Sequence, residues 1–125
     1  MITLGVAQAR IMRVLWERGE ATAREITDAL QTERPTAHST VQTLLRQLLA
    51  KGAVTHESRG RTFVFRPLVA ESEVGRSAAR ALLERAFGGS ISGLMAQLLE
   101  DDQPSHQEIA RLRHLIDEHD RKERP

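Results

Sequence analysis

Residues 36–51 read TAHSTVQTLLRQLLAK, and this stretch decides the fold of the chain. Its apolar residues recur at helical spacing and predict one buried stripe, made of Val41, Leu44, Leu45, Leu48 and Leu49. The opposite face is polar and free of acidic residues, with Ser39, Gln42, Thr43 and Arg46 at helical spacing and Thr40 at its edge. Such side chains match the donors and acceptors that base edges present in the major groove of DNA. We therefore interpret the stretch as a DNA-reading helix, with an ordinary amphipathic surface helix as the alternative.

Two further helices are predicted before this stretch. The first covers Val6 to Arg18, begins after Gly5 and ends at Gly19. Its buried stripe is expected to contain Ala7, Ile11, Val14 and Leu15. A capping box formed by Thr22 and Glu25 opens the second helix, and the segment 31–35 closes it because Pro35 disfavours helix in the residue before it.

After residue 51 the period of the apolar residues changes from helical to alternating. Residues 54–57 and 62–66 predict two strands, with Phe63 and Phe65 on one face. Residues 58–61 are expected to connect them, because Gly60 can supply the positive φ that hairpin turns often require. Three helices followed by a hairpin with a basic tip predict a winged helix-turn-helix domain over residues 1–67. In that fold the third helix enters the major groove, and the hairpin, or wing, reaches the neighbouring backbone or minor groove.

From residue 68 to 125 the chain is predicted to be helical, with apolar residues on several faces. Gly88 and Gly89 separate a helix over 71–87 from one that begins after Ser90, and a capping box of Ser105 and Glu108 opens the last helix. The charged tail from residue 117 is expected to fray. So short a segment cannot bury this apolar surface alone, which predicts a dimerisation domain that pairs with a second copy. The alternative is a monomer whose rear helices fold back on the front domain. The expected dimer interface consists of Leu82, Phe87, Ile91, Leu94, Met95, Leu98, Ile109, Leu112 and Ile116.

Composition narrows the function classes. The 125 residues suit one domain, or a small domain with an assembly module. The helices and strands predicted above place the chain in the mainly α class with a small β-hairpin. The chain contains no cysteine, which excludes disulfides, thiolate metal sites and cysteine nucleophiles. It has no signal peptide and no apolar run of the roughly 18 residues that a membrane span needs, so we expect a cytoplasmic protein without membrane insertion. Residues 1–67 hold ten Lys or Arg against six Asp or Glu, and residues 68–125 hold eight against eleven. A basic front half suits a polyanionic partner.

Several segments of the chain carry a family resemblance. They are Ile11–Trp16 in the first helix, Ser39–Leu45 and Leu48–Val54 around the third, Arg59–Pro67 in the hairpin, and Phe87–Ser90 and Glu108–Arg113 in the rear helices. In this order and spacing they resemble the penicillinase repressor and methicillin-resistance repressor family (BlaI/MecI type). The resemblance runs from about Leu4 to Ile116 and covers most of the chain.

The resemblance implies a dimeric repressor that covers palindromic operators in double-stranded DNA and blocks transcription. It also implies induction by a membrane sensor with a zinc protease domain, which triggers cleavage in the rear helices. The scissile Asn-Phe pair of the family aligns near Gln97 and Leu98, so this chain departs from the family at the cleavage region. The copper-responsive relatives carry a C-terminal cysteine cluster that this chain lacks, so thiolate metal sensing is excluded.

Roles follow for the residues of the third helix. In a twofold dimer the two copies of this helix lie in successive major grooves, about 10 bp apart or a multiple of that. Gln42 and Arg46 are expected to read bases, because an amide matches adenine and a guanidinium matches guanine. Ser39, Thr40 and Thr43 can reach phosphates or offer a hydroxyl or methyl group to a base.

Three residues outside this helix complete the predicted site. Arg59 and Arg61 at the wing tip are expected to hold phosphates or to enter the minor groove, which adds affinity more than sequence choice. Thr22, with the N–H groups at the start of the second helix, is a candidate phosphate seat. For every residue of the site, a solvated surface position is the alternative.

Other function classes receive less support. The five histidines are His38, His56, His106, His114 and His119. Those of the last helix lack the i, i+4 spacing that places two zinc ligands on one face. The sequence contains no phosphate loop, nucleophile elbow or dinucleotide fingerprint, so we expect no catalytic residue, no metal and no cofactor. A winged helix that contacts only protein is disfavoured by the acid-free face and the basic wing. A ligand-responsive winged-helix regulator is the nearest rival, and it would need a pocket among the rear helices.

Overall fold

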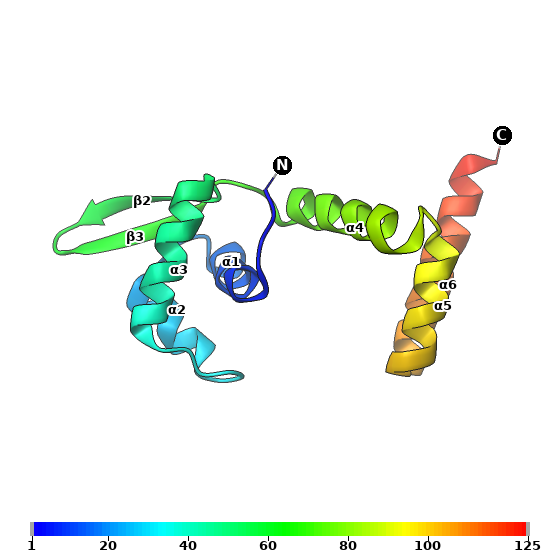
Figure 1. The fold of residues 1–125 in the computed structure, drawn as a ribbon, viewed down its shortest axis with the longest axis horizontal. Coiled ribbons are helices and arrows are strands. Elements are labelled where there is room, and N and C mark those ends of the chain that lie inside the picture. Colours follow the sequence, from blue (N-terminus) through cyan, green and yellow to red (C-terminus); the bar gives the residue numbers. More distant parts are fainter. Residues whose placement is uncertain (1, 125) are drawn as a thin grey trace. The chain divides into compact units, whose positions relative to one another are not determined.

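The computed structural model describes residues 2–124, over which six helices and three strands follow one another (Figure 1). They are α1 (Val6–Arg18), β1 (Ala21–Thr22), α2 (Ala23–Leu30), α3 (His38–Lys51), β2 (Val54–Arg59), β3 (Thr62–Pro67), α4 (Glu71–Phe87), α5 (Ile91–Asp102) and α6 (His106–Glu123). The chain divides into two compact units between Ala81 and Leu82, inside α4. We call them the front unit and the rear unit. The domain boundary predicted after residue 67 lies at the end of β3, whereas the two compact units divide later, inside α4, so the predicted boundary stays a prediction.

The core of the front unit is formed by one face of each of its first three helices and by the sheet. Its fully buried side chains include Ile11, Met12 and Leu15 from α1, Ile26 from α2, and Val41, Leu45 and Leu48 from α3. Burying an aliphatic side chain of this size stabilises a fold by about 1.5–3 kcal/mol. The apolar stripe of α3 is therefore held against α1 and α2, which leaves the opposite face of α3 free.

The inward side of α1 contains Gln8, whereas Ala7 is exposed, so the prediction that Ala7 belongs to the buried stripe is wrong. Both polar atoms of the Gln8 amide have partners: its Nε2 donates to Gln47 Oε1 at 3.0 Å, and its Oε1 accepts from Lys51 Nζ at 2.6 Å and from the Gly5 N–H at 3.0 Å. A buried polar group is tolerated when its hydrogen bonds are satisfied. Periodicity cannot reveal this, since two of the partners lie 39 and 43 residues away in the chain.

The sheet has three antiparallel strands in the order β1-β3-β2, one more than predicted. The additional strand β1 places Ala21 opposite Phe65 and Thr22 opposite Val64. Two residues are too few to produce an alternating pattern in the sequence. Thr22 is also the N-cap of α2, and its hydroxyl accepts from the Glu25 N–H at 3.1 Å, as the capping box predicts. β1 therefore ties the base of the wing to the start of α2.

The end of α3 is fixed by a Schellman motif. Gly52 adopts φ +77°, and its N–H donates to the Leu49 carbonyl at 3.1 Å. The Ala53 N–H donates to the Leu48 carbonyl at 3.0 Å. These two bonds satisfy carbonyls that a helix end otherwise leaves unpaired, and only glycine takes this backbone conformation at little cost. The chain thereby leaves α3 and enters β2 within two residues.

The wing is longer than predicted, because residues 58 and 59 belong to β2. Arg59 pairs with Thr62, so the turn consists of Gly60 and Arg61 alone, and Gly60 has φ +66°. The predicted connection, residues 58–61, therefore began two residues too early. Phe63 and Phe65 share a face, as predicted, and both lie beside the ring of His56, with ring centroids 4.7 and 5.4 Å apart.

The rear helices α4, α5 and α6 are well formed, yet none of their described residues is fully buried. Both predicted helix starts are confirmed: the Ser90 hydroxyl accepts from the Gly93 N–H at 2.9 Å, and the Ser105 hydroxyl accepts from the Glu108 N–H at 3.1 Å. Helices that bury nothing within one chain gain little of the packing energy that normally stabilises helices.

The last helix continues to Glu123, so the expected fraying from residue 117 is wrong. Two ion pairs at helical spacing support its final turns. Arg121 lies 3.1 Å from Glu118, and Arg124 lies 3.2 Å from Asp120. Each such pair contributes a few tenths of a kcal/mol to a helix, roughly 0.2–0.5.

Candidate nucleic-acid interface

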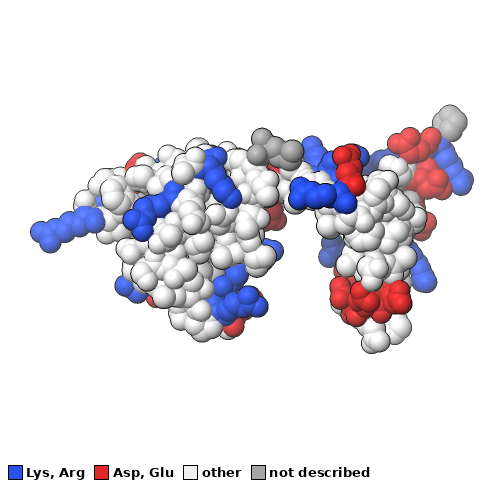
Figure 2. Space-filling model, in the orientation of Figure 1, with Lys and Arg blue, Asp and Glu red and all other residues white. Residues whose placement is uncertain are grey.

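The exposed face of α3 carries the predicted reading residues. All five of them are exposed, namely Ser39, Thr40, Gln42, Thr43 and Arg46. Arg46 Nη2 donates to Thr43 Oγ1 at 3.2 Å, and the Thr43 hydroxyl donates to the Ser39 carbonyl at 3.1 Å. Figure 2 shows basic side chains along α3 and at the tip of the hairpin. The face therefore offers an amide, hydroxyls and a guanidinium to a partner without an opposing carboxylate.

The connection between α2 and α3 is held in place by Arg10 of α1. Its Nη1 donates to Thr36 Oγ1 at 3.1 Å, and its Nη2 donates to the Arg34 carbonyl at 2.7 Å. Arg10 could not be predicted as part of the site, because nothing in the pattern of α1 marks a side chain that binds a distant loop. Arg10 acts on the interface indirectly, by fixing where α3 begins.

The first residue of α3, His38, is anchored to α2. Its Nδ1 lies 2.8 Å from Thr27 Oγ1, and the Thr27 hydroxyl itself lies 2.8 Å from the Ala23 carbonyl. A hydroxyl has one proton, and the carbonyl can only accept, so that proton goes to Ala23. His38 Nδ1 must then carry a hydrogen and donate it to Thr27.

Arg59 and Arg61 have different surroundings although both were predicted as phosphate ligands. Arg59 is bound by carboxylates: its Nη1 lies 2.5 Å from Glu20, and its Nη2 lies 2.6 Å from Glu57. Arg66 completes the cluster, at 3.2 Å from Glu20 and 2.8 Å from Glu57. We call these four residues the wing ion cluster. A phosphate contact by Arg59 stays a prediction, and both carboxylates would compete with the phosphate for this guanidinium.

The wing ion cluster changes the acidity of its members. The hydrogen bond from Arg59 lowers the pKa of Glu20 below its ordinary value, and it does the same to the pKa of Glu57. The same bonds, that to Glu20 first, raise the pKa of Arg59. All four groups are about half exposed, so each pair alone contributes little to stability. As a network they fix β2 and β3 to the segment that precedes β1.

Arg61 is the basic residue at the turn of the wing, and it is exposed. Within residues 2–124 it forms no ion pair and no side-chain hydrogen bond. The guanidinium therefore has no carboxylate competing with a phosphate.

Thr22 is engaged locally. Its hydroxyl accepts from Glu25, and its own N–H donates to Glu25 Oε1 at 2.9 Å, which lowers the pKa of Glu25. The carboxylate beside Thr22 opposes an anion there, so its role as a phosphate seat stays a prediction without added support. The neighbouring Arg24 is exposed and was missed. Its position could have drawn attention to it, because Arg24 is a cation in the first turn of α2, the helix that precedes α3.

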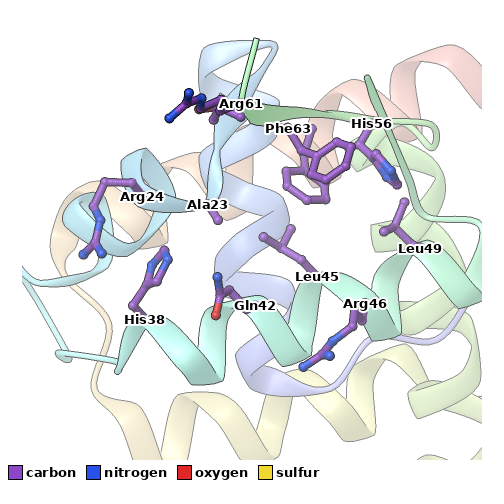
Figure 3. A pocket seen from close by; sticks show the side chains of 12 residues that line it. Ala23, Arg24, His38, Gln42, Leu45, Arg46, Leu49, His56, Arg61 and Phe63 are labelled. Carbon is purple, nitrogen blue, oxygen red and sulfur yellow. The ribbon is translucent and has the colours of Figure 1, made fainter. Parts of the chain in front are cut away.

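A groove of about 550 Å³ lies between α3 and the wing (Figure 3). We call it the α3–wing groove. Its apolar lining consists of Ala23, Leu45, Leu49, Phe63 and Phe65, and its polar lining includes Arg24, His38, Gln42, Arg46, His56 and Arg61. Figure 3 shows Phe63 and His56 on the wing facing Leu45 and Leu49 on α3, with Arg24 and His38 at one end. No acidic residue of the described chain lines this groove.

The residues predicted for dimerisation lie on the rear helices without a covering layer. The most exposed are Ile91 at 67%, Ile116 at 65%, Leu82 at 50% and Leu98 at 42%. The others are partly exposed, namely Phe87, Leu94, Met95, Ile109 and Leu112. Gln97 and Leu98 are exposed within α5, and Gln97 Nε2 donates to Asp101 at 2.7 Å. Large exposed apolar surfaces are typical of sites where proteins bind one another.

Other kinds of site find no support in the described residues. Within residues 2–124, no three His, Asp or Glu side chains gather as metal ligands do. None of the helices in that range combines the length and the apolar character that crossing a bilayer requires.

The chain resembles known proteins in sequence and in fold. A family model described as penicillinase repressor matches residues 4–118. The penicillinase repressor of Bacillus licheniformis is 31% identical over 113 residues, which are 90% of this chain and 88% of that protein. The solution structure of the DNA binding domain of the repressor BlaI covers 56% of this chain and 85% of its own, with TM-score 0.52 and 31% identity. Monomeric Bacillus licheniformis BlaI in complex with the blaP half-operator covers 58% and 88%, with TM-score 0.50 and 30% identity. The family match extends over residues of both units.

Proposed function

The chain belongs to the penicillinase repressor family, and from this premise we propose that it is a transcriptional repressor that binds a palindromic operator in double-stranded DNA as a homodimer. The related BlaI in complex with a half-operator supports DNA as the partner. A repressor shares a compartment with its operator, so the proposed place of action is the cytoplasm. Neither a catalytic residue nor a cofactor enters this proposal.

The observation that carries the proposal is the exposed, acid-free face of α3 next to a groove rimmed by arginines. α3 has the length and the polarity to lie in a major groove, with Gln42 and Arg46 directed at base edges. Arg24 and Arg61 lie on the rim, where the phosphates that flank the major groove would pass. Ser39, Thr40 and Thr43 complete the proposed contact surface.

A second copy of the chain is the proposed partner of the rear helices. These helices bury none of their described residues alone, and their exposed apolar residues recur along α4, α5 and α6. A twofold dimer covers the same patch on both copies and presents two copies of α3. Two reading helices with a fixed separation require two half-sites, which is why we propose a palindromic operator.

Replacing Arg46 by Ala is expected to weaken specific binding by about 1–3 kcal/mol and to relax one operator position, because a bidentate guanidinium contact with guanine is lost. The measurement is selection of bound duplexes from a random pool with the wild-type and the variant protein. The wild-type selection should return a palindrome whose half-sites lie about 10 bp apart or a multiple of that.

Arg13→Ala is the matched control for this experiment. Arg13 is exposed on α1 and lies outside the proposed contact surface. If Arg46→Ala selects the same motif with unchanged preference at every position, Arg46 does not read a base. If the wild-type protein enriches no motif at all, the proposed repressor function is wrong.

Replacing Arg61 by Ala is expected to weaken binding to all duplexes alike. It should lower the slope of log affinity against log salt by about one, since one phosphate contact disappears. Arg59→Ala changes the same charge in the same wing and provides the comparison. If the slope of log affinity against log salt falls less for Arg59→Ala than for Arg61→Ala, Arg59 stays in the wing ion cluster when DNA binds. If the two slopes fall equally, Arg59 contacts a phosphate as Arg61 does. Unchanged slopes in both variants would mean that the wing does not contact phosphates.

Proteolysis near Gln97 and Leu98 is the proposed route of derepression, triggered by a membrane sensor with a protease domain. The peptide bond lies inside α5, so α5 must open locally before a protease can hold it in an extended form. Cleavage there would separate α6 from α4 and remove the proposed dimer surface. Mass spectrometry of the products formed with the sensor's protease domain tests this step. An intact rear unit, together with loss of operator binding, would assign induction to another route.

A further inference from the structure

The apolar floor of the α3–wing groove is not explained by contact with DNA. Phosphates require the arginines at the rim, and base reading requires the polar face of α3. Neither requires Phe63, which leaves 52% of its surface exposed. Phe63 also packs edge-on against His56, with ring centroids 4.7 Å apart and planes at 80°. A large aromatic side chain held open in a groove is typical of a ligand-binding surface.

From this arrangement we infer that the α3–wing groove binds a small aromatic acid, whose ring lies on Phe63 and Leu49 and whose anionic group is held by the rim arginines, and that this binding excludes duplex DNA. The volume of about 550 Å³ is in the range of small-molecule sites, which is roughly 300–1,000 Å³. The proposed DNA-contacting face would thus also bind a small molecule.

The charge of the groove selects the ligand class. Arg24, Arg46 and Arg61 lie on the rim, and no described lining residue is acidic. A guanidinium binds a carboxylate or sulfonate through two parallel hydrogen bonds, which gives an anion an advantage over a neutral aromatic compound. The apolar floor disfavours a ligand that is charged along its whole length. A single anionic group on an aromatic body fits both surfaces.

The exclusion of DNA follows from shared residues and rests on the proposed function. Arg46 and Arg61 belong to the proposed contact surface for DNA, and they also line the groove. A ligand that engages them removes them from the bases and phosphates. Such a ligand acts at the recognition helix itself, whereas the cleavage route acts in the rear unit.

The experiment uses the full chain and the fluorescent probe anilinonaphthalene sulfonate, an aromatic monoanion. Its titration without DNA measures binding to the groove, and its uncharged relative N-phenylnaphthylamine measures the part due to charge. We expect Phe63→Ala to weaken probe binding about fivefold to tenfold through the lost apolar contact. Arg61→Ala should weaken the sulfonate about threefold and leave the uncharged probe unchanged. A saturating amount of the sulfonate should then raise the apparent Kd for a selected operator duplex at least tenfold.

Matched controls locate the probe. Val6→Ala removes an apolar side chain that is 78% exposed on α1, and Arg13→Ala removes an exposed cation; neither should change probe binding. Equal affinity of wild type and Phe63→Ala overturns the groove as the site, since the probe then binds elsewhere, for example on the rear helices. Equal binding of both probes overturns the anionic class.

Operator binding measured with and without the saturating sulfonate probe distinguishes a failure of this inference from a failure of the proposed function. Operator binding that is indifferent to a bound probe overturns the exclusion of DNA and leaves the repressor proposal intact. A protein that binds no duplex overturns the proposed function and the exclusion with it. In that case the titration without DNA still decides whether the groove binds an aromatic acid.

Discussion

Replacing Leu98 by Asp is expected to convert the protein into a monomer and to weaken binding to a full operator by about 10²- to 10⁴-fold. The second half-site contact then ceases to be intramolecular, and the gain from effective concentration is lost. Leu98 is 42% exposed in the single chain and belongs to the apolar stripe of α5. A carboxylate placed in that stripe would have to lose its water on assembly, which is costly without a partner charge. Light scattering gives the oligomeric state, and titration gives the operator affinity.

Ala96→Asp provides the matched control, because Ala96 is exposed in the middle of the same helix but lies outside the apolar stripe. It should leave the protein dimeric. For Leu98→Asp, the affinity for a duplex with one half-site should stay within about twofold of wild type, since the substitution lies in the other unit. A Leu98→Asp protein that remains dimeric would remove α5 from the interface, and an unchanged operator affinity in a true monomer would refute the paired reading helices.

Replacing Leu48 by Ala is expected to destabilise the front unit by about 2–5 kcal/mol, because the substitution leaves a cavity between α3 and the rest of the core. Leu48 is 0% exposed. The chain contains one tryptophan, Trp16, whose Nε1 donates to the Val69 carbonyl at 2.9 Å in the front unit. Its fluorescence during urea unfolding therefore follows the front unit specifically.

Leu48→Met is the conservative comparison, and it should cost less than about 1.5 kcal/mol because volume and polarity are kept. The DNA-reading face is untouched in both variants. At temperatures where each variant is folded, operator preference should equal that of wild type. A small loss of stability in Leu48→Ala would mean that α3 is attached to the core less firmly than its burial indicates.

The helices could be predicted from the sequence because their signals are local. Apolar spacing placed the buried face of α3, although Leu44 and Leu49 of the predicted stripe are only partly buried. Gly19 and Gly52 marked two helix ends, and Ser90 and Ser105 marked two helix starts. These features depend on residues within a few positions of one another. For the same reason the polar face of α3 could be identified as exposed before its surroundings were known.

The features that escaped prediction depend on residues far apart in the chain. Gln8 points inward because Gln47 and Lys51 meet it, and β1 exists because β3 passes beside it. The wing ion cluster joins Glu20 to Arg59 across 39 residues, so the different surroundings of the two wing arginines could not be foreseen. Arg24 is different, because its place in the first turn of α2 is a local feature that the sequence already shows.

The rear helices connect the repressor's stability to its supply. None of the described residues of α4, α5 and α6 is fully buried within one chain, so we expect assembly in the proposed dimer to supply part of the energy that holds these helices folded. At low concentration a larger fraction of the protein is monomeric, and its rear helices are accessible to proteases. At high concentration most of the protein is expected to be dimeric and protected. If the proposed dimer forms, we expect turnover to slow as abundance rises, so that the amount of repressor responds more steeply than its rate of synthesis.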